Sequence, residues 1–257
     1  MTDLAVIATH LDELLNTAAI PDYPGALNGL QLANRGSITR VAASVDISRR
    51  VVEQTIDVGA NLLVVHHGMF WGGAQPITGA TYDRLRLLLT HDVAVYASHL
   101  PLDAHGSLGN NVLLARALGL EPTGGFARFK TVDVGVRGAS DVDTAELWKR
   151  ADEFARTHGG IARRTPVAAG HRTRHWAICT GAGASSETLL EAQAHGVDTL
   201  IVGEGPHHTA VAADDAGIVV IYAGHYATET LGVRAVAEHL TETFGIPSTF
   251  IAAPTGL

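Results

Sequence analysis

The sequence predicts an α/β protein built from two related halves. One observation is the alternation of helix-like and strand-like segments along the 257 residues, which is typical of α/β layers. The other is a pattern that occurs twice: an apolar run, then Tyr-Ala, a small residue, a histidine and, four residues later, a carboxylate. It is found at His99–Asp103 and again at His225–Glu229. An apolar content of 46% is typical of a globular protein with a sizeable core.

Hydrophobic periodicity, caps and helix breakers place the expected elements. Ser48 is a typical N-cap, Gly59 a typical helix C-terminus, and Pro21 ends the first helical pattern. The segment His158–His171 is rich in Gly and Arg and gives no prediction. The expected helices are near 3–18, 48–59, 79–90, 110–118, 144–157, 186–195, 207–216 and 228–244. The expected strands are near 39–46, 62–66, 93–99, 131–136, 175–179, 199–203, 218–223 and 248–252.

A second internal resemblance also favours two halves. The segments Ser48–Gly68 and Ser185–Gly205 both predict a capped helix, a glycine, a strand and a polar turn. A generic βαβ pattern explains this pair equally well, whereas the repeated Tyr-Ala-x-His pattern is more particular. The expected halves are residues 1–124 with 220–257, which carry most of the candidate metal ligands, and residues 125–219.

Charge and composition argue against several classes of protein. The formal net charge of −8 disfavours a protein that coats nucleic acid or an anionic membrane. A nucleotide substrate stays open, because a bound metal supplies positive charge. Cys179 is the only cysteine and lies in an apolar run, so we expect a buried, inert thiol. The N-terminus lacks a basic region and no apolar run reaches about 20 residues, so we expect a cytoplasmic protein without a membrane span.

Three strand-like segments each end in side chains that bind metals well. His66 and His67 end one apolar run, and the two histidine–carboxylate pairs follow two others. Open α/β sheets usually place their sites at such strand ends. Imidazole and carboxylate together suit Zn, Fe, Mn, Co or Ni. The sequence therefore predicts two divalent transition-metal ions per subunit. The candidate ligands are His66, His67, His99, Asp103, His225 and Glu229.

Some of these assignments have alternatives. If the strand continues through them, His66 and His67 point to opposite faces, so they serve two metals or one of them only orients a ligand. His99 either binds metal or orients Asp103, and Pro101 favours a loop between the two. We expect no role for the isolated histidines His10, His91, His158, His195 and His239.

A second polar turn, Gly203–His208, takes the place of the double histidine in the other half. Its Glu204 is a candidate catalytic group and His208 a candidate substrate contact. Alternatively, His207 and His208 are metal ligands or simply form the first turn of a helix. The segment Gly181–Ser186 has amides that suit a phosphate, but we favour a tight turn with a serine cap.

These motifs resemble a known family, the NGG-one-interacting-factor-three-like proteins, whose members are often called GTP cyclohydrolase I type 2 homologues. The resemblance implies two interlinked, structurally similar α/β halves, assembled as a toroidal homohexamer with paired metals that face an inner cavity. It implies Glu229 as a bridge between two metals. The matching motifs are Asn28–Gln31, His66–Trp71, His99–Asp103, Gly203–His208 and Gly224–Glu229. The implied ligands are His66, His67, Asp103, His225 and Glu229.

The chain departs from the family pattern at two points. Gly68 follows the double histidine where proline is usual, and we expect it to loosen the loop without removing a ligand. Long members carry an extra domain between the halves, and residues 124–175 are too few for one. The chain therefore resembles the short, bacterial form.

The leading functional hypothesis is a metal-dependent hydrolase, because two neighbouring metals activate water and stabilise the charge formed when it attacks. Glu204, or His99 in its neutral form, would then move protons. The expected substrate is a nucleotide or related small molecule, with guanine-ring opening, phosphate ester hydrolysis and amide hydrolysis all open. The alternative is a non-catalytic protein that stores, delivers or senses metal, or a scaffold for partners. Nucleic-acid binding inside the ring is disfavoured by the negative charge.

Overall fold

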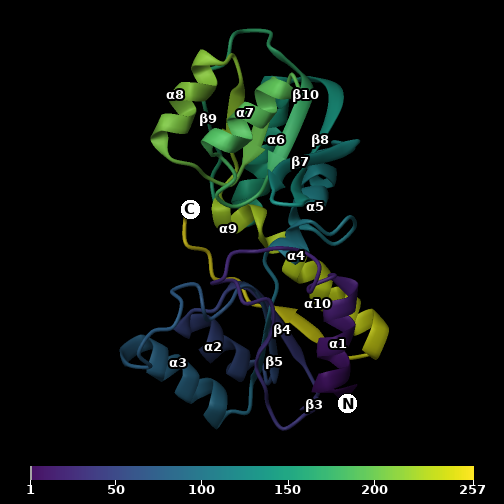
Figure 1. Cartoon of the computed structure of the whole chain (residues 1–257), viewed down its shortest axis with the longest axis vertical. Coiled ribbons are helices and arrows are strands. Elements are labelled where there is room, and N and C mark those ends of the chain that lie inside the picture. Colours follow the sequence, from purple (N-terminus) through teal and green to yellow (C-terminus); the bar gives the residue numbers. More distant parts are fainter. Residues whose placement is uncertain (1) are drawn as a thin grey trace. The chain divides into compact units, whose positions relative to one another are not determined.

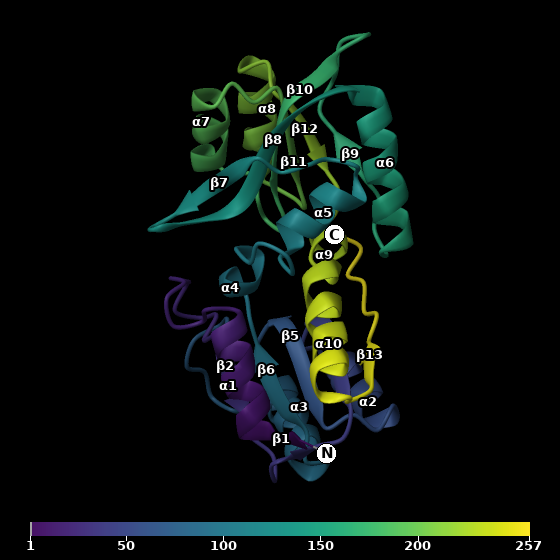
Figure 2. The same cartoon turned by 90° about the vertical axis from the view of Figure 1, so that its right-hand side faces the viewer.

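The computed structural model describes residues 2–257, and the chain divides into two compact units. The first unit holds the residues up to Leu102 together with Gly232–Ala253. The second unit holds Asp103–Leu231 together with Pro254–Leu257. The chain passes between the units three times (Figure 1, Figure 2), so the two α/β units are interlinked in sequence.

The unit boundaries differ from those expected at 124/125 and 219/220. The strand Val219–Tyr222 pairs with Thr199–Val202, and the helix Asn110–Ala117 packs into the core that these strands share. Hydrogen bonding and packing therefore place both elements in the second unit. As a result, the second unit carries three of the candidate ligands, Asp103, His225 and Glu229.

The first unit is organised around a five-stranded sheet. Its strands are β2 (Gly29–Leu32), β4 (Val41–Asp46), β5 (Leu62–His67), β6 (Ala94–Ala97) and β13 (Ser248–Phe250). Their order is β13-β4-β5-β6-β2, and all are parallel except β2 at the edge. The first five residues of β4 and of β5 are buried, as parallel strands covered on both faces require. A short ribbon pairs β1 (Thr2–Asp3) with β3 (Ser37–Ile38).

Helices cover both faces of this sheet. They are α1 (Leu4–Leu14), α2 (Arg49–Asp57), α3 (Gly79–Thr90) and most of α10 (Thr230–Phe244). Figure 1 shows α2 and α3 on one face and α1 and α10 on the other. Leu63 and Val95 share a core with Val52 of α2. On the other face, Tyr96 donates a hydrogen bond to Asp12 of α1 (2.7 Å).

Local sequence signals set the ends of several elements in the first unit. Ser48 caps α2 through its side chain, and Gly59 follows α2 with a φ of +70°, as predicted. α1 ends earlier than predicted because Asn16 takes the left-handed conformation (φ +51°). α4 (Leu100–Asp103) is a single helical turn instead of the expected loop. Pro101 fits there because a first helical turn does not need its N–H.

The second unit has a six-stranded sheet. Its strands are β7 (Gly124–Phe129), β8 (Val132–Asp143), β9 (Arg163–Arg164), β10 (Arg172–Cys179), β11 (Thr199–Val202) and β12 (Val219–Tyr222). The order is β7-β8-β10-β11-β12-β9, with β10, β11 and β12 parallel. The apolar pattern does not predict β7, because two glycines and Arg128 interrupt it.

The helices of the second unit are α5 (Asn110–Ala117), α6 (Thr144–Thr157), α7 (Ser186–Ala194), α8 (His207–Asp215) and α9 (His225–Thr228). α5 and α6 pack with Trp176 and Ile201 in the main core, and Figure 2 shows α7 and α8 across the sheet from α6. α9 and α10 replace the single helix predicted over 228–244, because the chain leaves helical geometry at Glu229 (φ −103°). No helix formed by residues 2–257 is long and apolar enough to cross a lipid bilayer.

The two sheets share the order and direction of four strands, β4-β5-β6-β2 in the first and β10-β11-β12-β9 in the second. The order β4-α2-β5-α3-β6 in the first unit corresponds to β10-α7-β11-α8-β12 in the second. In both units the third strand also pairs with an antiparallel edge strand that precedes the first in sequence, β2 or β9. In both units the histidine of the Tyr-Ala-x-His pattern follows the third strand. The internal resemblance in the sequence therefore reflects a repeated order of elements.

Candidate metal centre

The carboxyl ends of β5 and β6 bring three histidines together. His66 and His67 end β5, and His99 follows β6 by two residues. Adjacent parallel strands end at the same edge of a sheet, which is why residues 32 positions apart meet here. One ring nitrogen of each histidine lies within 4.8 Å of those of the other two. We call these three residues the histidine cluster.

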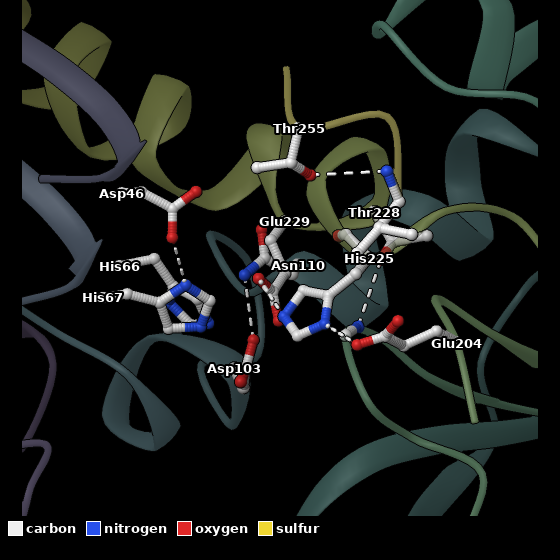
Figure 3. Close-up of polar contacts among 12 residues, drawn as sticks. Asp46, His66, His67, Asp103, Asn110, Glu204, His225, Thr228, Glu229 and Thr255 are labelled. Carbon is white, nitrogen blue, oxygen red and sulfur yellow. Dashed lines mark hydrogen bonds and ion pairs between the residues drawn. The ribbon is translucent and has the colours of Figure 1, made fainter. Parts of the chain in front are cut away.

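β5 lies between β4 and β6. His66 contacts the residue that follows β6, and His67 contacts the last residue of β4. The Nδ1 of His66 lies 2.9 Å from the carbonyl oxygen of Ser98. The Nδ1 of His67 lies 2.9 Å from Asp46 Oδ1, as Figure 3 shows. Carbonyl and carboxylate oxygens only accept hydrogen bonds, so Nδ1 is the donor in each ring. In the neutral imidazole the ligand atom is then Nε2, as in most metal-binding histidines.

His99 is held by the loop that precedes β2. Its Nδ1 donates to Asp22 Oδ1 (2.9 Å), and its backbone N–H donates to Asn28 Oδ1 (2.8 Å). Asn28 also donates to Asp22 (2.8 Å). Burial raises the pKa of Asp22, but the hydrogen bonds from His99 and Asn28 outweigh burial and lower it. An ionised Asp22 therefore fixes the ring of His99.

Gln31 holds the loop that follows the double histidine. Its Oε1 accepts a hydrogen bond from the Met69 amide (2.7 Å), and its Nε2 donates to the Ala26 carbonyl (3.0 Å). A Cβ at Gly68 would overlap the Gln31 side chain. Glycine at position 68 therefore leaves room for the Gln31 side chain. The hydrogen bonds of Gln31 hold this loop, which opposes the looser loop expected from the sequence.

Two aromatic side chains flank the histidine cluster. The Trp71 ring meets the His99 ring edge-on, with centroids 4.7 Å apart, and the Tyr23 ring lies 6.2 Å from His99. Both aromatic residues are exposed. They provide flat apolar surface beside the histidines.

The second unit brings a histidine together with two carboxylates. His225 starts α9 after β12, Glu229 caps the end of α9, and Glu204 follows β11. His225 Nδ1 lies 2.7 Å from Glu204 Oε1, and His225 Nε2 lies 3.1 Å from Glu229 Oε2 (Figure 3). The contact with Glu229 agrees with the prediction that a spacing of four brings the two side chains to one side of a helical turn.

These contacts of His225 with two carboxylates favour a bound cation. Burial opposes the charge on His225, but the carboxylates of Glu229 and Glu204 outweigh burial and raise its pKa to about 9. In the neutral ring, the Nε2 lone pair would face Glu229 as one acceptor against another. A proton or a metal ion between them removes this repulsion.

Asp103 is fixed by the core of the second unit. It is buried, and its Oδ1 accepts a hydrogen bond from Asn110 Nδ2 (2.9 Å; Figure 3). The next residue, Asn111, donates to the Val134 carbonyl (2.7 Å) and accepts from the Thr180 amide (2.8 Å). The start of α5 is thereby tied to β8 and to the end of β10, which leaves the Asp103 carboxylate in a defined position.

Two glycines make room for His225 and Glu229. Gly181 has a φ of +61°, and a Cβ there would overlap Glu229 Oε1. A Cβ at Gly203 would lie 2.8 Å from the Cα of His225. The Gly181 amide also donates to Thr228 Oγ1 (3.1 Å). Glycine is therefore required at position 181 for both its conformation and its closeness to a candidate ligand.

The segment Gly181–Ser186 is the capped turn that the sequence analysis favours. The Ser185 side chain accepts from the Thr188 amide (3.1 Å), and the Thr188 hydroxyl accepts from the Ser185 amide (2.9 Å). This reciprocal capping box starts α7.

His208 and His207 form the exposed first turn of α8. His207, rather than His208, lines a cavity of about 390 Å³, together with Glu204, Arg163 and Tyr222. The substrate contact assigned to His208 stays a prediction. Burial raises the pKa of the Cys179 thiol to about 12, and the nearby carboxylates of Asp103 and Glu229 add to the effect. The inertness of this thiol stays a prediction.

The residues that hold the candidate ligands in place were not predicted from the sequence. The sequence could have indicated Asp46, because it ends a predicted strand in the same way as His66. Asn110 begins a predicted helix, and nothing in its local pattern indicates a carboxylate partner seven residues earlier. The missed residues are Asp22, Asp46, Ser98, Asn110 and Gly181.

The donor atoms of both units fit a divalent transition metal. Imidazole nitrogens dominate in the first unit, and one imidazole with carboxylate oxygens is found in the second. This mixture suits Zn, Mn, Fe, Co or Ni better than Ca or Mg, which prefer oxygen.

Comparison with known proteins shows which family the chain resembles. A family model described as Duf34/NIF3 (NGG1p interacting factor 3) matches residues 2–255. A protein of Deinococcus radiodurans named GTP cyclohydrolase 1 type 2 homolog is 40% identical over 253 residues, which cover 96% of this chain and 92% of that protein. A protein of Halobacterium salinarum with the same name is 37% identical over 257 residues, covering 99% and 100%.

Solved structures show the same fold. A protein described as ybgI, of unknown function, has a TM-score of 0.89 and 33% identity and covers all of both chains. TTHA1606 from Thermus thermophilus has a TM-score of 0.87 and 33% identity, covering 99% of this chain and 100% of that one. The chain therefore belongs to the Duf34/NIF3 family.

Proposed function

We propose that the protein binds two divalent transition-metal ions and is a metal-dependent hydrolase. The observation that carries the proposal is the histidine cluster, in which an oxygen acceptor fixes each Nδ1 and so makes Nε2 the ligand atom. Glu229 would contribute its carboxylate to holding the ions. The proposed ligands are His66, His67, Asp103, His225 and Glu229.

Two of the proposed ligands lie close in sequence to the points where the chain passes between the units. Asp103 follows His99 by four residues, so the two Cα atoms are at most about 14 Å apart in any conformation. Glu229 lies two residues before Leu231, after which the chain returns to the first unit. Both carboxylates are therefore next to the points where the chain passes between the units.

The residues around the ligands have definite tasks in this proposal. When bound, the metal ions lower the pKa of water and stabilise negative charge that develops on the substrate. Glu204 positions His225 and lines the 390 Å³ cavity, so it is the first candidate to accept a proton from a molecule bound there. His99, with its Nδ1 fixed on Asp22, is the second candidate, as a third histidine ligand or as a proton carrier.

The cavity of the second unit favours a small-molecule substrate. A volume of about 390 Å³ lies within the usual range of about 300–1,000 Å³ for such sites. Arg163 and His207 line the cavity and suit an anionic group. The relatives named GTP cyclohydrolase 1 type 2 homolog make a guanine nucleotide the first substrate to test.

A non-catalytic role in metal storage, delivery or sensing is the second candidate function. The same ligands serve it. The proton that His225 binds with a pKa of about 9 competes with a metal ion, so acid favours release. This competition suits a protein that gives up its metal.

The deciding experiment uses full-length protein purified without an affinity tag. It is stripped with a chelator, reloaded with Zn²⁺, Mn²⁺ or Fe²⁺, analysed for metal per chain, and assayed against nucleotides, phosphodiesters and small amides. We expect two ions per chain, and turnover that is lost in Asp103→Ala and Glu229→Ala while circular dichroism shows retained folding. Glu153→Ala, an exposed acid on α6, is the matched control.

The outcomes separate the candidates. Two ions without turnover on any substrate class would favour the storage role. Failure of the wild-type protein to bind any of the three metals would end both proposals. The proposal also includes the homohexamer implied by the sequence resemblance, and sedimentation analysis of the reloaded protein tests that state.

A further inference from the structure

The first unit also contains a pair of histidines that is separate from the histidine cluster. No role is expected for either of them from the sequence. His10 of α1 and His239 of α10 have their Nε2 atoms 2.8 Å apart. Their rings are nearly parallel, with an interplanar angle of 5° and centroids separated by 5.1 Å. Phe244 packs edge-on against His10. Two helices at opposite ends of the chain thus present imidazole nitrogens to one another.

The sequences that begin at the two histidines match at three of four positions. His10–Glu13 reads His-Leu-Asp-Glu, and His239–Glu242 reads His-Leu-Thr-Glu. In a helix, residues three apart lie on one face, so each histidine has a carboxylate one turn further along its own side. The intervening Leu11 and Leu240 are both fully buried, which fixes the rotation of both helices and turns the histidines toward each other.

The surroundings leave space for an ion and its ligands. His10, Glu13, Thr243 and Phe244 line a cavity of about 510 Å³ on this side of the first unit. Glu13 and Glu242 are exposed, so their side chains can change rotamer without disturbing the core. Thr243 Oγ1 lies 3.3 Å from His239 Nε2 and adds an oxygen near the pair.

We propose that His10 and His239, assisted by Glu13 and Glu242, bind one Zn²⁺ or Ni²⁺ ion that links α1 to α10. Imidazole with carboxylate is a donor set that both ions accept. Two nitrogens on one tetrahedral Zn²⁺ are roughly 3.3 Å apart, because each Zn–N bond is about 2.0–2.1 Å. The 2.8 Å pair therefore needs to open by only about half an ångström.

The charge state of the pair supports this assignment. Burial lowers the pKa of His239, and His10 lowers it further, because two adjacent imidazolium ions would repel each other. A neutral ring is the form that binds metal. The ion would fasten together residues 229 positions apart and so hold the first helix against the last.

The test removes ligands of the metal centre under "Proposed function", called the main centre here. Metal binding by His10 and His239 is then measured alone. Full-length protein with His66→Ala, His67→Ala and Glu229→Ala is stripped with a chelator and titrated with Ni²⁺ and with Zn²⁺ by calorimetry. We expect one equivalent to bind, and we expect His10→Gln or His239→Gln in the same background to abolish it. His91→Gln, an exposed histidine of the same unit, is the control and should leave it unchanged.

A second measurement uses the otherwise unmodified protein, so that the result does not depend on how well the triple variant folds. Adding the metal to about 100 times its dissociation constant should raise the unfolding temperature of the His91→Gln control by roughly 5–10 °C more than that of the His10→Gln variant. Equal shifts for the two variants, or a triple variant that folds but binds neither Ni²⁺ nor Zn²⁺, would overturn the proposal. Because the main centre does not contain His10 or His239, its own failure leaves this result unaffected.

Discussion

Asp46 Oδ1 accepts a hydrogen bond from the Nδ1 of His67 at 2.9 Å, across 21 positions of sequence. The two residues are register partners on the parallel strands β4 and β5. The strand pairing that builds the sheet therefore also delivers the carboxylate that orients a candidate metal ligand. Carboxylate–histidine pairs of this kind fix the tautomer and raise the basicity of the ligand nitrogen.

The first prediction concerns this pair. Asp46→Ala should weaken metal binding by about 10- to 100-fold, because the His67 ring loses the acceptor that fixes its Nε2 as the ligand atom. Calorimetric titration of stripped protein with Zn²⁺ measures the change. Asp57→Ala, which removes an exposed acid of α2 in the same unit, should leave the affinity unchanged. Equal affinities in the two variants would contradict the role of Asp46.

The second prediction concerns pH. The pKa of His225 is raised from its ordinary value to about 9 in the folded, metal-free protein. Its protonation therefore adds stability that is fully present below about pH 6.5 and is lost as the pH rises through about 9. Thermal unfolding of stripped protein from pH 6 to 10 should show this loss. Glu204→Gln removes one of the two carboxylates responsible and should reduce the loss; an unchanged profile would contradict the assignment.

The third prediction separates backbone strain from displacement of a ligand. Gly181 and Gly196 have nearly equal φ values, +61° and +63°, but only at Gly181 would a Cβ meet Glu229. Gly196→Ala should cost about 1–2 kcal/mol of unfolding free energy, the cost of a left-handed alanine. Gly181→Ala should cost roughly 3 kcal/mol or more and should also weaken metal binding. Denaturant unfolding and metal titration of the two variants provide the comparison, and equal effects would refute it.

The fourth prediction concerns Cys179. Burial raises its pKa to about 12, so at pH 8 only about one thiol in 10⁴ is ionised, compared with roughly a quarter of unperturbed thiols. Alkylation by iodoacetamide at pH 8 should be on the order of 10³-fold slower in the native protein than in unfolded protein. Mass spectrometry of timed samples gives both rates. Rapid labelling under native conditions would show that the thiol is accessible and ionised.

Patterns with a regular period predicted most of the fold. Caps and periodicity located α3 and α6 with the bounds that the structure has, 79–90 and 144–157. They failed at β2 and at β7, and at Glu229, where one predicted helix is two. In β7, glycine and arginine interrupt the apolar pattern, and the strand is specified by its antiparallel pairing with β8.

The candidate site, like the fold, is predictable from the sequence only in part. Strand ends and the spacing of four predict His66, His67, His225 and Glu229 as candidate ligands, because those signals are local. The orienting partners come from elsewhere in the chain, as Asp22 does for His99 across 77 positions. Such pairs depend on tertiary contacts, which a period or a spacing within one segment does not encode.

The strand β13 has a consequence for how the protein is made. It forms the edge of the first sheet beside β4, although it leaves the ribosome about 200 residues after β4, whereas the strands of the second sheet lie in one continuous stretch from β7 to β12. Domains generally fold as they emerge during translation. Here the part whose synthesis starts first must stay incomplete until nearly the whole polypeptide has been translated, while the later part already has every strand it needs.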